Sequence, residues 1–84
     1  MPGSVASAER IGELVRDTLG VHAPGPDVDL IDTGLIDSLA LVTLIAELES
    51  EFDIQFPLES FDVEDFRTLE RIAAVVNATR GKSG

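Results

Sequence analysis

The chain has 84 residues, which is room for one compact domain and too few for a second. Sixteen acidic residues against six basic ones give a net charge of −10, which disfavours binding to nucleic acid and to anionic membrane surfaces and favours basic protein partners. With no cysteine and a single histidine, the chain can build neither a disulfide framework nor a thiolate or histidine-rich metal centre.

The composition also indicates the fold class and the cellular setting. Apolar residues make up 44% of the chain but aromatic residues only 5%, which suits a helical bundle. We therefore expect an all-α fold and one domain over residues 1–84, with an ordered core at about residues 4–79. Residues 1–4 lack the basic and apolar blocks of a secretory signal, and no apolar run approaches the ~20 residues that span a bilayer. We expect a cytoplasmic protein that does not insert into membranes.

The first predicted helix covers residues 4–19 and ends at Gly20. Its apolar positions recur at steps of three and four: Val5, Ala8, Ile11, Leu14, Val15 and Leu19. A long connection over residues 21–37 follows, punctuated by prolines and glycines. Four apolar anchors predict that this connection is an ordered loop packed on the bundle: Val28, Leu30, Leu35 and Ile36.

The second predicted helix begins with Asp37 as its N-cap and runs to about Asp53. Its apolar positions are Leu39, Val42, Ile45, Leu48 and Phe52. Pro57 prevents an extension, and residues 56–66 predict a bend and a short third helix anchored by Leu58, Phe61, Val63 and Phe66. Thr68 caps a fourth helix with the apolar stripe Leu69, Ile72, Ala73 and Val76, and residues 80–84 are expected to fray.

The most informative stretch is residues 32–39, Asp-Thr-Gly-Leu-Ile-Asp-Ser-Leu. It combines a glycine turn, an apolar pair, the capping Asp37 and, at the first helical position, Ser38. A serine there lies beside the positive end of the helix dipole and the unpaired N–H groups of the first turn, which favours a covalently attached phosphate. The pattern gives Ser38 no partner that would make it a nucleophile.

This stretch, together with Glu-Ser-Glu-Phe-Asp-Ile at residues 49–54, resembles the acyl carrier protein family over nearly the whole chain. The family has a four-helix fold and the hallmark Asp-Ser-Leu at the start of its second helix. The resemblance implies that a phosphopantetheinyl transferase attaches 4'-phosphopantetheine from coenzyme A to Ser38. The thiol of that arm would hold acyl or aminoacyl groups as thioesters. Asp37 matches the acidic residue before the serine and Leu39 the apolar residue after it, and such a carrier is not itself an enzyme.

The resemblance further implies that the second helix recognises partner enzymes. These would be an acyltransferase or adenylating ligase that loads the arm, and synthases or other pathway enzymes with basic patches. We expect a monomer that docks through Asp37, Leu39, Val42 and Glu49. Ala40, Leu41 and Thr43 make this face less acidic than is typical of the family. Two alternatives stay open for Leu41, a contact with a partner or a place in the core.

The segment at residues 60–68 bears on the type of cargo. It is longer than in fatty acid carriers and resembles D-alanyl and other aminoacyl carriers, with a Phe-Asp start and an aromatic residue before the last helix. Phe61 and Phe66 are interpreted as core anchors. The less acidic second helix and this longer segment predict a freestanding bacterial carrier for polyketide or aminoacyl intermediates, in secondary metabolism such as antibiotic biosynthesis.

Three other functions are alternatives to a carrier: a hydrolase, a calcium-binding protein and an unmodified interaction module. A hydrolase lacks a base, because His22 is the only histidine and no Gly-x-Ser-x-Gly motif exists; we expect His22 on an exposed loop. Residues 27–32 begin like a calcium-binding loop, but Ile31 cannot ligate and Asp32 replaces the required glycine, so no metal site is expected. The remaining alternative is an unmodified acidic helical module that binds a basic partner, with Ser38 merely structural.

Overall fold

The computed structural model describes residues 6–57, 59 and 62–82. Its elements with described bounds are α1 (Ala8–Leu19), α2 (Ser38–Phe52), the 3-10 helix η2 (Val63–Phe66) and α3 (Leu69–Lys82). The all-α prediction is confirmed over this part of the chain, which contains three α-helices; the count of four helices is not confirmed. The predicted short third helix is observed as η2, a single 3-10 turn of four residues that lies between its caps Asp62 and Arg67.

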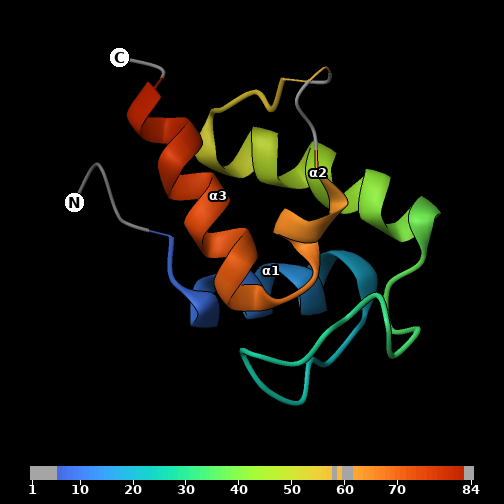
Figure 1. Ribbon diagram of the computed structural model, residues 1–84. Coiled ribbons are helices and arrows are strands. Elements are labelled where there is room, and N and C mark those ends of the chain that lie inside the picture. Colours follow the sequence, from blue (N-terminus) through green and yellow to red (C-terminus); the bar gives the residue numbers. More distant parts are fainter. Residues whose placement is uncertain (1–5, 58, 60–61, 83–84) are drawn as a thin grey trace.

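The three α-helices pack against one another around a common core. Each α-helix contacts the other two, and η2 packs against α3. Figure 1 shows α2 lying along one side of the bundle, α3 crossing it at an angle, and the long segment before α2 covering one end. Among the described residues, no helix is long and apolar enough to cross a membrane.

Helix α1 begins later than the sequence predicted. Ser7 has an extended backbone and its hydroxyl accepts the Arg10 N–H at 3.1 Å, which makes it the N-cap of a helix that starts at Ala8 rather than residue 4. The predicted positions Ser4 and Val5 lie outside the described residues. At the other end, Gly20 has φ +70° and donates its N–H to the Arg16 carbonyl at 2.9 Å, so the predicted stop at this glycine is confirmed.

The predicted starts of α2 and α3 are confirmed. The Asp37 carboxylate accepts the Ala40 N–H at 2.8 Å, and the Thr68 hydroxyl accepts the Arg71 N–H at 3.1 Å. Helix α2 ends at Asp53, whose φ of 55° is left-handed. Helix α3 continues to Lys82, three residues beyond the expected end of the ordered core at residue 79.

The core is apolar throughout, and among the described residues no polar side chain is buried. It contains the whole predicted stripe of α3, while α2 contributes Leu41, Leu44 and Leu48. Of the stripe predicted for the second helix, Leu48 is buried, Ile45 and Phe52 are half-buried against the core, and Leu39 and Val42 are exposed. The buried residues are Ala6, Ile11, Leu14, Val15, Leu30, Ile36, Leu41, Leu44, Leu48, Ile54, Phe56, Phe66, Leu69, Ile72, Ala73 and Val76.

The predicted anchors of the connecting segments are confirmed in part. Phe66 is buried and meets Phe56 edge to face, with ring centroids 5.3 Å apart and an interplanar angle of 83°. Val63 is exposed and is not an anchor, while Leu58 and Phe61 lie outside the described residues. Of the four anchors in the long loop, Leu30 and Ile36 are fully buried. Val28 is half-buried and Leu35 is exposed.

Candidate functional site

Ser38 is the first residue of α2 and is exposed. The Asp37 carboxylate caps the Ala40 N–H, and the Asp37 carbonyl accepts the Leu41 N–H at 2.9 Å. Within the described residues, the Ser38 hydroxyl and the N–H groups of Ser38 and Leu39 have no hydrogen-bond partner. An accessible hydroxyl beside two open amides at the positive end of a helix fits a phosphodiester to a phosphopantetheine group.

A hydrogen-bonded turn leads the chain into this helix start. The Thr33 N–H donates to the Asp29 carbonyl at 3.2 Å, and the Gly34 N–H donates to the Ile31 carbonyl at 3.0 Å. Gly34 has φ +80°, a conformation that side chains other than glycine rarely adopt. Because buried Ile36 then fixes the chain two residues before Ser38, the serine projects from an ordered base.

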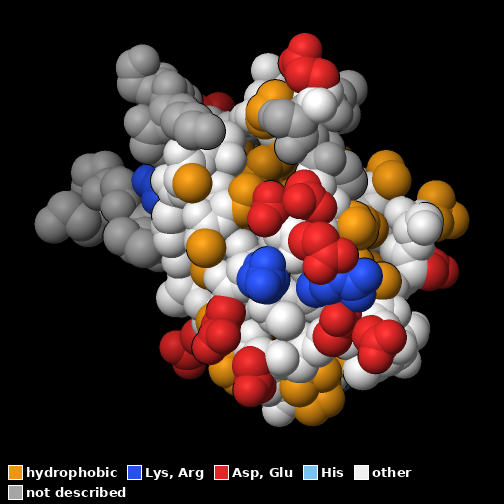
Figure 2. Space-filling model, in the orientation of Figure 1, with side chains coloured by type: hydrophobic (Ala, Val, Ile, Leu, Met, Phe, Trp, Pro, Cys, Tyr) orange, Lys and Arg blue, Asp and Glu red, His pale blue; other side chains and the backbone are white. Residues whose placement is uncertain are grey.

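An apolar surface surrounds the start of α2. Leu39 is 76% exposed and Val42 is 63% exposed, so two residues expected to meet a partner are accessible, and Leu35 adds a third exposed apolar side chain from the loop. Figure 2 shows hydrophobic side chains over this end of α2, at the right of the view. The first turn of α2 contains no acidic residue, as the sequence indicated.

Leu41 requires a correction as a partner contact. Its side chain is only 7% exposed and belongs to the core cluster with Leu44 and Leu48. Of the two alternatives left open by the sequence, the core position is the observed one, because Leu41, Leu44 and Leu48 follow at helical steps and define the inward face.

Glu49, the acidic residue expected to meet partners, has an intramolecular role that the sequence analysis missed. It is half-buried, and its Oε2 accepts the Phe56 N–H at 2.9 Å. The same residue's carbonyl accepts the Ile54 N–H at 3.0 Å. Glu49 therefore closes the end of α2 and holds the chain that leaves it. Glu51, two residues later in α2, pairs with Arg10 of α1.

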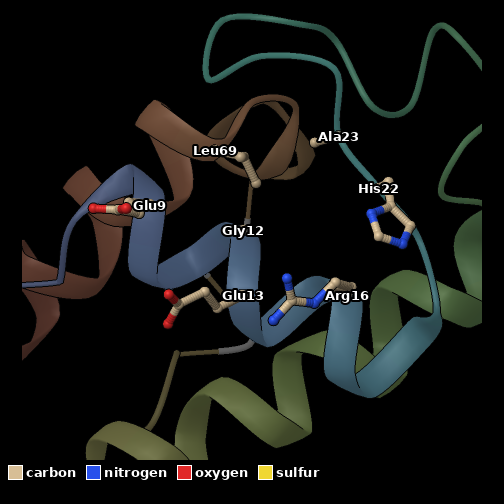
Figure 3. Close-up of a pocket in the computed structure, with 7 residues that line it drawn as sticks. All are labelled: Glu9, Gly12, Glu13, Arg16, His22, Ala23 and Leu69. Atoms are coloured by element: carbon tan, nitrogen blue, oxygen red, sulfur yellow. The ribbon is translucent and has the colours of Figure 1, made fainter.

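His22 is exposed, as predicted, and lines an open pocket with residues of α1 and Leu69 of α3. Figure 3 shows its ring on the loop after α1, near Arg16, and Ser38 is not among the residues that line this pocket. The described residues contain no cluster of His, Asp or Glu suited to a metal. Asp29, the third position of that calcium-like loop, accepts hydrogen bonds from Arg67 and two backbone amides.

Comparison with known proteins adds evidence of a different kind. Residues 9–76 match the family model described as "Phosphopantetheine attachment site". A D-alanyl carrier protein from Leuconostoc mesenteroides is 35% identical over 74 residues, covering 87% of this chain and 95% of that protein. D-alanyl carrier proteins from Streptococcus thermophilus and Lactococcus lactis are 44% and 40% identical over 54 and 57 residues, covering 64% and 68% of this chain and 68% and 72% of theirs.

The family match covers most of the chain, and it includes the turn before α2, the exposed serine, all of α2, nearly all of α1 and the first part of α3. The chain therefore belongs to the acyl carrier protein family, whose members hold 4'-phosphopantetheine as a covalently attached group.

Proposed function

We propose that this protein is an aminoacyl carrier and that Ser38 is the residue to which phosphopantetheine is attached. The observation that carries the proposal is the exposed Ser38 hydroxyl at the start of α2, beside two unpaired backbone amides. The attached group supplies a thiol that holds the cargo as a thioester. The residues of this chain expose the serine, cap the helix and present a docking surface, and catalysis belongs to the partner enzymes.

The relatives favour an aminoacyl cargo over the polyketide intermediates that the sequence left as an equal possibility. The relatives compared above are named D-alanyl carrier proteins, so D-alanine is the first cargo to test. We propose that an adenylating ligase loads the arm in the cytoplasm and that the carrier acts as a monomer. The D-alanyl carrier proteins compared above do not point to an antibiotic or polyketide pathway.

The proposed docking surface consists of Asp37, Leu39 and Val42, with Leu35 beside them. Their exposure supports this choice, and Leu41 and Glu49 are left out because one is buried and the other holds the Phe56 N–H. The net charge of −10 supports partners whose docking face carries basic patches around an apolar contact.

The attachment site is tested by intact-protein mass spectrometry after incubation with coenzyme A, magnesium and a phosphopantetheinyl transferase. Wild type should gain the mass of one phosphopantetheine and Ser38→Ala should gain none while keeping its helical circular dichroism. Ser50→Ala is the matched control, because Ser50 is also an exposed serine of α2 and should not affect modification. Modification of Ser38→Ala would place the attachment on another residue and overturn the assignment of Ser38, whereas no modification of wild type would favour the unmodified interaction module.

The cargo is tested on the phosphopantetheinylated protein. Incubation with ATP, an adenylating ligase and D-alanine should add one alanyl group that hydroxylamine releases, as expected of a thioester. The comparison uses an acyltransferase with malonyl coenzyme A. Efficient loading by the acyltransferase and none by the ligase would overturn the aminoacyl proposal without affecting the assignment of Ser38.

A further inference from the structure

Arg67, between η2 and α3, holds the loop before α2 through both its side chain and its backbone. Its Nη1 donates to the Asp29 carboxylate, to Oδ2 at 3.0 Å and to Oδ1 at 3.3 Å. Its carbonyl accepts the Leu30 N–H at 2.7 Å. One residue near the start of α3 therefore fixes two consecutive residues of a segment that lies 38 positions earlier in the chain.

The two residues that Arg67 holds organise the turn that follows. Asp29 Oδ1 also accepts the N–H groups of Ile31 at 3.0 Å and Asp32 at 2.8 Å. The carbonyl of Leu30, which is fully buried, accepts the Ile36 N–H at 2.9 Å. Hydrogen bonds therefore run without interruption from Arg67 to Ile36, which lies directly before the capping residue of α2.

The other contacts of this region show that Arg67 is the residue that holds the turn before α2. The first half of the loop is held by a different hydrogen bond, which the Glu70 N–H donates to the Pro26 carbonyl at 3.1 Å. Glu64 accepts from Arg67 Nε at 2.9 Å and orients the guanidinium, and within the described residues no hydrogen bond or ion pair joins Glu64 to the loop. Figure 2 shows acidic side chains enclosing the basic ones on the face that carries η2 and the start of α3.

We propose that Arg67 is a positioning residue for the modification of Ser38. By fixing the turn at residues 29–36, it holds Leu35 and the start of α2 in the arrangement that a docking enzyme meets. This inference rests on the proposed role of Ser38. A loop that is already ordered before docking loses little conformational entropy when the enzyme binds. Releasing the loop therefore weakens binding and leaves the chemical step unchanged.

The test measures phosphopantetheine transfer to wild type, Arg67→Gln and Asp29→Asn with one transferase, at a temperature where circular dichroism shows every variant folded. We expect both variants to raise KM for the carrier by about 5- to 10-fold and to leave kcat within about 2-fold, because the cost falls on docking. Arg67→Lys should fall between, since an ammonium cannot reproduce the forked guanidinium contact. Glu64→Gln is the matched control and should resemble wild type.

Amide hydrogen exchange supplies a readout of the loop itself. In Arg67→Gln and Asp29→Asn, the amides of Leu30 and Ile36 should exchange faster, whereas the amide of Val15 in the middle of α1 should not change. A residue with only a stabilising role would lower the unfolding midpoint and leave the KM of the folded protein unchanged. If Arg67→Gln loses its helical signal, Asp29→Asn carries the test, because an amide oxygen can still accept from Ile31 and Asp32.

Each outcome bears on one proposal or the other. Transfer to Arg67→Gln and Asp29→Asn with the wild-type KM would overturn the positioning role and leave Ser38 as the attachment residue. Absence of transfer to wild type would overturn the assignment of Ser38 and, with it, the positioning role of Arg67.

Discussion

The carboxamide of Asn77 pairs with the backbone of Ala6, 71 positions earlier in the chain. Its Nδ2 donates to the Ala6 carbonyl and its Oδ1 accepts the Ala6 N–H, each at 2.8 Å. Ala6 is only 2% exposed, so water does not readily replace either bond. One side chain in the middle of α3 therefore fixes the segment that enters α1.

Replacing Asn77 with alanine should lower the free energy of unfolding by about 1–3 kcal/mol, because two buried backbone groups of Ala6 lose their partners. Urea unfolding followed by circular dichroism measures the change. Asn77→Asp keeps the acceptor for the Ala6 N–H but places a carboxylate against the Ala6 carbonyl, so it should also destabilise. Wild-type stability in both variants would show that the pair contributes nothing measurable.

Asp37→Ala should destabilise the domain by about 0.5–2 kcal/mol, since the Ala40 N–H loses its cap. Asp37→Asn keeps a capping oxygen and should stay near wild-type stability. The same two variants separate capping from charge in partner recognition. If Asp37→Asn is stable but slowly modified by the transferase, the negative charge contributes to docking; equal rates for Asp37→Asn and wild type would remove Asp37 from the proposed docking surface.

The ends of α1 and α2 offer a matched pair of substitutions. Gly20 and Asp53 both have a left-handed backbone and both donate their N–H to a carbonyl of the last helical turn. Gly20→Ala should destabilise by about 1 kcal/mol, and Asp53→Gly should stabilise by about 0.5–1 kcal/mol, because a Cβ is disfavoured in this conformation. Thermal or urea unfolding tests both, and the same sign of change in the two variants would contradict the explanation.

Asp29 should contribute to the pH dependence of stability. The Asp32 N–H, followed by Arg67, holds the pKa of its carboxyl below the usual value, against the opposing effect of desolvation. Because the folded-state pKa is the lower one, this contribution is present above the unfolded value of about 3.9 and is lost as the pH falls through the folded value. Glu64, the other carboxylate on Arg67, keeps its pairing when Asp29 is replaced.

Urea midpoints measured at about pH 7, 5 and 3 test this contribution. The midpoint of wild type should fall more steeply below about pH 4 than that of Asp29→Asn, which cannot titrate at this position. Parallel curves for the two proteins would show that the ionisation of Asp29 does not contribute to folding.

Local rules predicted much of the fold. The caps at Asp37 and Thr68 and the stop at Gly20 each depend on residues within one helical turn, and all three were confirmed. The buried stripe of α3, Leu69, Ile72, Ala73 and Val76, was also confirmed. Ser38 was singled out on similar local grounds, from the turn and the cap that precede it.

The rest depended on information that no short window contains. The first half of α2 is apolar on nearly every side, so its periodicity could not distinguish buried Leu41 from exposed Leu39 and Val42. The role of Glu49 appears only once the chain has turned back after Asp53 and brought the Phe56 N–H to its carboxylate.

The hydrogen bond between Leu30 and Arg67 also sets an order of events during synthesis. The ribosome releases the turn and Ser38 before it releases Arg67, so a nascent chain cannot complete the surroundings of the serine until α3 is being made. The segment at Ala6 is fixed later still, because its partner Asn77 is synthesised after Arg67. On the proposed role of Ser38, a transferase that recognises the finished turn would modify completed domains in preference to fragments, and coenzyme A would be spent on chains that have folded.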